Sequence, residues 1–202
     1  GLGKGVEHFR VGQKITANPS VACGTCASCQ YDNNVLCRSA GSAMKGFAEL
    51  ITVPTSVAVP LPDTLSFADG ALIEPLAISL YGVRHAGIVP GDRVLVLGGG
   101  TVALYAIYWA RRLGAGKIVA MSRSARRADL CLAMGADQFI QYGENEVGEV
   151  IEALGGSPDR VFECAGAEGL LMKALSHVRP FGNVVSLGFC TGPDPVMPSI
   201  AS

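Results

Sequence analysis

From residue 93 onward, short apolar runs alternate with longer segments in which apolar residues recur at helical spacing. The short runs are bounded by Gly and rich in Val, Ile and Leu, which is typical of strands buried on both faces of a parallel sheet. Strands that alternate with helices through right-handed crossovers predict a doubly wound α/β fold. We expect strands at 93–98, 117–121, 137–141, 160–165 and 183–188, and helices at 101–115, 124–136, 146–154 and 170–178.

The first 65 residues follow a different pattern, rich in Pro, Gly and Asn. Short β-type runs separated by turn residues predict an irregular β region. These runs lie at 14–19, 49–53 and 57–62. A helix is expected at 67–87, where apolar positions return at helical spacing. We therefore divide the chain into one domain of residues 1–72 and a second of residues 73–202.

The composition narrows the class of protein. Of the 202 residues, 49% are hydrophobic and 16% are charged, which is ample for a packed core. A net charge of -1 favours neither nucleic acid nor an anionic membrane as a partner. No apolar run reaches the ~20 residues that span a bilayer, and the first residues lack signal-peptide features, although a removed leader stays open. We expect a cytoplasmic protein.

Four of the seven cysteines are crowded into residues 23–37, with the spacing C-x2-C-x2-C-x7-C. Gly24 permits the tight turn that such short steps require. Zinc binds four thiolates in a tetrahedron, and a closed shell of four cysteines leaves no position for substrate. Two disulfides would be strained at these spacings, while an iron–sulfur cluster or four unrelated thiols stay as alternatives. We predict a structural zinc site formed by Cys23, Cys26, Cys29 and Cys37. The other thiols are expected to be free, in a reducing compartment.

A glycine-rich turn lies between a predicted strand and a predicted helix. Residues 98–103 read GGGTVA, which has the G-x-G-x-x-A form of a dinucleotide-binding motif. Gly98 makes the tight turn, and Gly100 lets the backbone approach a pyrophosphate. Thr101 and Val102 open the helix, whose free N–H groups and dipole attract phosphates. A turn without a ligand is the alternative, but the strand–turn–helix context favours a Rossmann nucleotide site.

The end of the second strand bears on the choice of cofactor. Proteins that bind NAD usually carry Asp or Glu there to hold the ribose 2′-hydroxyl. Here the strand ends at Ser122, and Arg123, Arg126 and Arg127 follow without a carboxylate at the strand end. Arginine attracts a 2′-phosphate, whereas an acid would repel it. We therefore favour NADP(H) over NAD(H) and expect Ser122, Arg123 and Arg127 at the site. NAD(H) binding and a merely solvated helix start stay as alternatives.

Several motifs follow one another along the chain: Phe9-Arg-Val-Gly12, the cysteine cluster, Gly46-Phe-Ala-Glu49, Glu74-Pro-Leu and the glycine-rich turn. In this order and spacing they resemble the zinc-dependent medium-chain alcohol dehydrogenase family, and Glu74-Pro-Leu is most similar to its polyol and threonine dehydrogenase branch. The resemblance implies part of a GroES-like catalytic domain followed by part of a Rossmann domain. It also implies hydride transfer between a secondary alcohol or polyol and NAD(P).

The resemblance further implies a catalytic zinc that polarises the alcohol oxygen. In the polyol branch a Glu at the position of Glu74 ligates or flanks that zinc, so Glu74 is the predicted catalytic and metal-binding residue; capping or pairing on its helix is the alternative. The family's other ligands, a Cys and a His-Glu pair, precede the cysteine cluster. His8, His85 and His177 do not replace them, because none has a ligand neighbour at a useful spacing. We expect a fragment lacking both ends and normal turnover.

Two later turns are also candidates for the cofactor site. Ala165 and Gly166 follow the fourth strand, and Gly188 follows the fifth. Ligands bind at the carboxyl ends of strands in open α/β sheets. In the family these turns line the nicotinamide half of the cofactor, and the alternative is that they merely end strands.

The expected function is that of an NAD(P)-dependent oxidoreductase, with a small alcohol or ketone as substrate and a homo-oligomer in the full-length form. Two other functions stay open. A zinc-free quinone or enoyl reductase of the same superfamily conflicts with the four cysteines, and metal analysis separates it. A non-enzymatic module could use zinc and nucleotide for structure or sensing, and the full reading frame separates that alternative.

Overall fold

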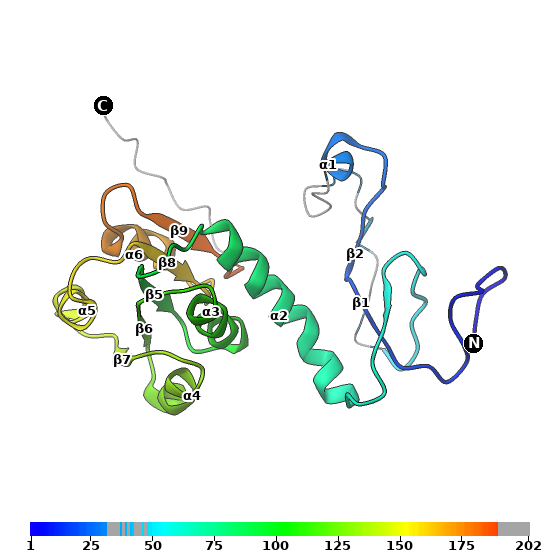
Figure 1. The fold of residues 1–202 in the computed structure, drawn as a ribbon, viewed down its shortest axis with the longest axis horizontal. Coiled ribbons are helices and arrows are strands. Elements are labelled where there is room, and N and C mark those ends of the chain that lie inside the picture. Colours follow the sequence, from blue (N-terminus) through cyan, green and yellow to red (C-terminus); the bar gives the residue numbers. More distant parts are fainter. Residues whose placement is uncertain (32–36, 38, 40, 43–45, 47, 190–202) are drawn as a thin grey trace. The chain divides into compact units, whose positions relative to one another are not determined.

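A computed structural model describes residues 1–31, 37, 39, 41–42, 46 and 48–189 (Figure 1). The chain divides into two compact units, Gly1–Glu74 and Pro75–Ser202. The division falls inside helix α2 (Phe67–His85). The domain boundary expected after residue 72 stays a prediction.

Two small antiparallel ladders form the regular part of the first unit, together with one short helix. Strand β1 pairs with β4, and β2 pairs with β3. These elements are β1 (Ile15–Ala17), β2 (Ser20–Val21), α1 (Ala27–Gln30), β3 (Gly41–Ser42) and β4 (Ala58–Pro60). The strands expected at 14–19 and 57–62 are confirmed in shorter form.

The strand expected at 49–53 is wrong. Residues 49 and 50 lie in a bend, and 51–53 have no regular structure. Leu50 is 92% exposed and Ile51 is 47% exposed. None of the described strands pairs with this run, and a strand needs a partner for its backbone N–H and C=O groups. Its β-type composition alone is therefore not sufficient.

Helix α2 begins with a reciprocal cap. The Ser66 hydroxyl accepts a hydrogen bond from the Asp69 N–H at 3.1 Å, and the Asp69 carboxylate accepts one from the Ser66 N–H at 2.8 Å. This cap satisfies donors at the helix start and puts a negative charge at its positive end. Pro75 lies inside the helix, and the Ser79 hydroxyl donates to the Pro75 carbonyl at 2.8 Å. The helix expected at 67–87 is confirmed.

The second unit contains a five-stranded parallel sheet in the order β7-β6-β5-β8-β9. Its strands are β5 (Arg93–Leu97), β6 (Lys117–Ser122), β7 (Gln138–Gln141), β8 (Arg160–Glu163) and β9 (Asn183–Ser186). The chain leaves β5 toward β6 and later returns to its other side with β8, which makes a topological switch point where ligands bind. All five strands were expected, so the doubly wound α/β fold is confirmed.

Helices cover both faces of this sheet (Figure 1). They are α3 (Thr101–Arg112), α4 (Ala128–Ala133), preceded by the 3-10 turn η2 (Ala125–Arg127), α5 (Glu146–Leu154) and α6 (Leu170–His177). Val94 and Val96 of β5 are buried in one core with α3 and α4. Leu95 and Leu97 are buried in the other core with α5 and α6. Because successive strand residues point to opposite faces, a strand covered on both sides is apolar throughout.

Within the part of the chain that the structure describes, none of the helices is both long enough and apolar enough to cross a membrane.

Candidate functional site

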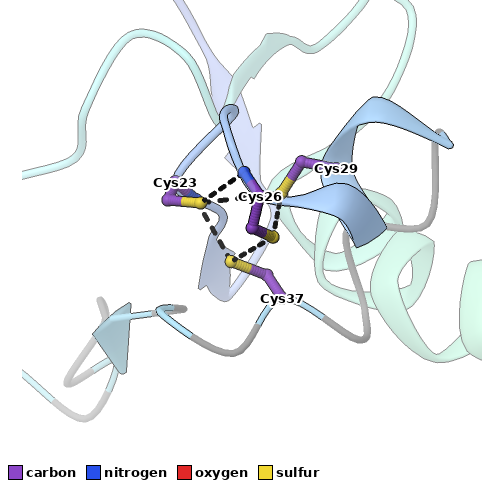
Figure 2. A group of neighbouring side chains, drawn as sticks. All are labelled: Cys23, Cys26, Cys29 and Cys37. Atoms are coloured by element: carbon purple, nitrogen blue, oxygen red, sulfur yellow. Dashed lines mark hydrogen bonds between the residues drawn. The ribbon is translucent and has the colours of Figure 1, made fainter.

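The four clustered cysteines lie together in the first unit (Figure 2). All four Sγ atoms are within 4.8 Å of one another. Cys26 Sγ is 3.5 Å from Cys29 Sγ and 3.9 Å from Cys37 Sγ. Gly24 adopts a φ of 74° in the turn between the first two cysteines, a conformation that favours glycine. Four sulfurs at this separation fit around a single tetrahedral zinc ion.

The surroundings of the sulfur atoms shift the pKa values of the cysteine thiols in opposite directions. The backbone and hydroxyl of Thr25 and the N–H of Cys26 lower the pKa of Cys23 to about 6. Partial burial and the bond with Cys26 raise the pKa of Cys29 to about 12. A divalent cation favours the thiolate form of every ligand, because its charge is the largest in the site. Metal binding at this cluster therefore requires the release of protons.

Glu74 is exposed on α2 and is not a member of the cysteine cluster. Among the described residues, the cysteines are the one group of three or more His, Cys, Asp or Glu side chains close enough together to hold a metal ion. Glu74 therefore belongs to no group of three or more such ligands among the described residues, and its role in metal binding stays a prediction.

The glycine-rich turn joins β5 to α3. Gly98 has a φ of 127°, and a Cβ there would contact Ala103 and Cys164 at 3.6 Å. Gly100 is the N-cap of α3 and provides no side-chain cap, so the first N–H groups of this 12-residue helix lack a side-chain partner. A Cβ on Gly100 would meet nothing within 4 Å. The turn therefore leaves open space before a positive helix end, as a phosphate site requires.

A cleft of about 440 Å³ opens beside this turn. It brings together the turn, the end of β6, the segment after β7 and the start of α6. Its lining includes Gly98, Gly99, Ser122, Arg123, Tyr142, Ala165, Leu170 and Lys173. Four of the residues predicted for the cofactor thus share one cleft in the second unit: Gly98, Ser122, Arg123 and Ala165.

The other predicted cofactor residues are not among those that line this cleft. Arg127 Nη1 donates to the Gly99 carbonyl at 3.0 Å, so its guanidinium contacts the turn itself. Thr101 is exposed, and the Val102 carbonyl accepts a bond from the Ser79 hydroxyl at 3.1 Å. Gly166 and Gly188 lie against each other, since a Cβ on Gly188 would come within 2.1 Å of the Gly166 nitrogen.

Glu163 is a buried carboxylate at the end of β8 that the sequence reasoning did not identify. It is 2% exposed. Its Oε1 accepts bonds from the N–H groups of Ala165 at 2.7 Å and Gly166 at 2.8 Å, and its Oε2 accepts one from the Ser186 hydroxyl at 3.1 Å. The sequence could have indicated Glu163, because it is an acidic residue at the end of a buried strand. Glu163 fixes the turn that lines the cleft and ties it to β9.

Two family models match the chain. The zinc-binding dehydrogenase model matches residues 101–201, which is half of the chain, and the alcohol dehydrogenase GroES-like domain model matches residues 1–63. Sorbitol dehydrogenase of Bacillus subtilis (strain 168) is 29% identical, and the match covers 93% of this chain and 55% of that protein.

Two solved structures are similar in both fold and sequence. One, from Sinorhizobium meliloti 1021, is described as a zinc-binding dehydrogenase bound to NADP. It has a TM-score of 0.83 and 33% identity, over 95% of this chain and 58% of that one. The other, from Escherichia coli CFT073, is described as an alcohol dehydrogenase complexed with NADH. It has a TM-score of 0.85 and 26% identity, over 97% of this chain and 60% of that one.

The chain thus spans about half the length of the curated relatives that it matches. The family resemblance drawn from the motifs is confirmed, including the similarity to polyol dehydrogenases. Since one family model covers half of the chain and the other covers most of the rest, the chain belongs to the zinc-binding dehydrogenase family.

Proposed function

We propose that this chain is the part of an NAD(P)-dependent dehydrogenase that holds the cofactor and a structural zinc. The whole protein transfers a hydride between a secondary alcohol or polyol and the nicotinamide ring. The main support for the proposal is the glycine-rich turn at residues 98–103, which places the start of α3 beside a cleft that contains the end of β6. The similarity to sorbitol dehydrogenase supports the polyol substrate.

NADP(H) is the preferred cofactor in this proposal. Arg123 lines the cleft directly after β6, and the strand end carries Ser122 instead of an acid. A 2′-phosphate in the cleft would meet a guanidinium and no carboxylate from this strand end. Similar proteins have been solved with NADP and with NADH, so both cofactors belong in the test.

The cysteine cluster holds a structural zinc in this proposal. Four convergent sulfurs support it, and they leave no ligand position for substrate. A bound catalytic zinc supplies Lewis-acid polarisation of the alcohol oxygen, and Glu74 is the residue of this chain proposed to ligate or flank it. Among the described residues, Glu74 belongs to no group of three or more metal-ligand side chains.

The compartment and assembly are part of the same proposal. None of the described cysteines forms a disulfide, which supports a reducing compartment such as the cytoplasm. A small alcohol or ketone substrate and a homo-oligomeric whole protein follow from the family.

Substitution of Gly100 by Val tests the nucleotide site. Because a Cβ at Gly100 meets no atom within 4 Å, G100V should fold normally while its side chain occupies the space of the pyrophosphate. Titration followed by the increase in NADPH or NADH fluorescence on binding measures the affinity for each cofactor. We expect the wild-type chain to bind NADPH more tightly than NADH. G100V should lower both affinities at least about tenfold, the equivalent of 1.4 kcal/mol.

The matched control is Gly3→Val, another glycine with room for a side chain, outside the second unit. It should bind like wild type. Equal affinities of G100V and wild type would contradict the nucleotide site, and a clear preference of the wild type for NADH would contradict the choice of NADP(H).

A further inference from the structure

Four side chains that have no role in the proposed function form a cluster beside the cleft. The Lys173 ammonium is 2.6 Å from Glu146 Oε1 and lies 4.6 Å from the centre of the Tyr142 ring. The His177 ring lies 3.8 Å from the same Glu146 oxygen. Glu146 begins α5, whereas Lys173 and His177 belong to α6. Tyr142 and Lys173 both line the cleft, so the cluster reaches the surface at the nucleotide site.

The place of Tyr142 and Lys173 relative to the sheet indicates which half of the dinucleotide they would contact. In this fold the end of the second strand contacts the ribose of the adenosine half. That position is Ser122 of β6, and Tyr142 follows the neighbouring strand β7. Backbone bonding joins the two ends, because the Tyr142 N–H donates to the Ser122 carbonyl at 3.1 Å. Lys173, above the Tyr142 ring, therefore faces the adenosine half.

The pairing of Lys173 decides what kind of group it can recognise. An ammonium has three N–H donors, and Glu146 uses one of them. The carboxylate also offsets the positive charge, so the remaining donors suit a neutral acceptor better than a phosphate. Adenine ring nitrogens and ribose oxygens are neutral acceptors. The Tyr142 ring and the Glu146 carboxylate fix the direction of the ammonium, which lowers the entropy cost of one further bond.

Stability alone is a weak explanation for this pair, in which Glu146 is buried while the Lys173 side chain is 35% exposed. Glu146 is 9% exposed, and its Oε2 has no hydrogen-bond partner among the described residues. An ion pair whose carboxylate is buried with one oxygen unpaired returns little net stability, because desolvation of the carboxylate offsets the attraction. A binding role accounts for its place on the cleft.

We propose that Lys173 recognises the adenosine half of the dinucleotide by donating a hydrogen bond from Nζ to a neutral acceptor, with Glu146 and Tyr142 holding it in place. This inference rests on the proposed nucleotide-binding function. It adds a specificity-determining residue on α6 to a site otherwise built from the glycine turn and the end of β6.

Calorimetric titration with ADP-ribose tests the proposal, since this ligand lacks the nicotinamide. Lys173→Met removes the donor but leaves Glu146 unpaired, so the double variant E146Q/K173M, which removes both charges, is measured beside it. Both should bind ADP-ribose about tenfold more weakly than wild type, the effect of one lost hydrogen bond. The loss should be the same at low and high salt, because the acceptor is neutral. Lys117→Met at the start of β6, outside the cleft lining, should bind like wild type.

The outcomes separate this proposal from the function on which it rests. Wild-type affinity in the folded double variant overturns the role of Lys173 and leaves the nucleotide site intact. A loss that disappears at high salt also overturns it, because that result indicates attraction to a phosphate. A wild-type chain that binds no ADP-ribose overturns the proposed function itself.

Discussion

Glu163 shapes the cleft beside the glycine-rich turn although it is not one of the residues that line it. Its carboxylate accepts two backbone N–H groups from the turn after β8 and the hydroxyl of Ser186 from β9. A Cβ on Gly188 would also come within 2.5 Å of Glu163 Oε2. The acid and the facing glycines therefore form one packed arrangement, in which a small change displaces a turn that lines the cleft.

Replacement of Glu163 by Ala should lower the free energy of unfolding by about 2 kcal/mol, because two backbone donors lose their acceptor. Glu163→Gln should retain most of the stability, since its amide oxygen can accept from the turn while its NH2 donates to the Ser186 hydroxyl. Urea denaturation of both variants measures the difference. Equal stabilities of E163A and E163Q would mean that hydrogen bonding at this position does not hold the turn.

At the scale of the elements, the contact between α5 and α6 carries a buried titratable group. His177 is 3% exposed, and both ring nitrogens lack a hydrogen-bond partner among the described residues. Burial lowers its pKa, the Glu146 carboxylate of α5 acts in the opposite direction, and Lys173 of its own helix lowers it further. The neutral ring is therefore the form that packs between these helices.

Stability should consequently fall as the pH drops below about 6.5, the ordinary pKa of His. Between that value and the lower pKa of the folded state, the unfolded chain binds more protons than the folded chain, so protons favour unfolding. Thermal unfolding at pH 7 and pH 5 measures the loss, and His177→Leu should reduce it. An H177L variant with the same pH dependence as wild type would assign the effect to another group.

The elements were easier to predict from the sequence than the contacts between them. β5 and β6 were recognisable because burial on both faces requires unbroken apolar runs. The run at 49–53 has the same local character, yet no described strand pairs with it. The bonds of Glu163 and the Glu146–Lys173 pair depend on residues far apart in the sequence, which periodicity does not report. Arg127 shows the same limit, since its bond to Gly99 depends on how η2 meets the glycine turn.

At the scale of the whole molecule, two kinds of chemistry are divided between two compact units. The four convergent sulfurs belong to the first unit, and the glycine turn with its cleft belongs to the second. Membership of the zinc-binding dehydrogenase family connects the two. We propose that this one chain holds a zinc ion through its cysteines and a dinucleotide at the edge of its parallel sheet.

Native mass spectrometry of the purified chain with NADPH detects both ligands in one experiment, because each adds its own mass to the protein. We expect one zinc ion and one NADPH per wild-type chain. Cys37→Ser should lose the zinc, because three cysteines leave the tetrahedral site incomplete. A wild-type chain that carries no zinc would rule out the metal site, and one that carries zinc but takes up no NADPH would rule out the nucleotide site.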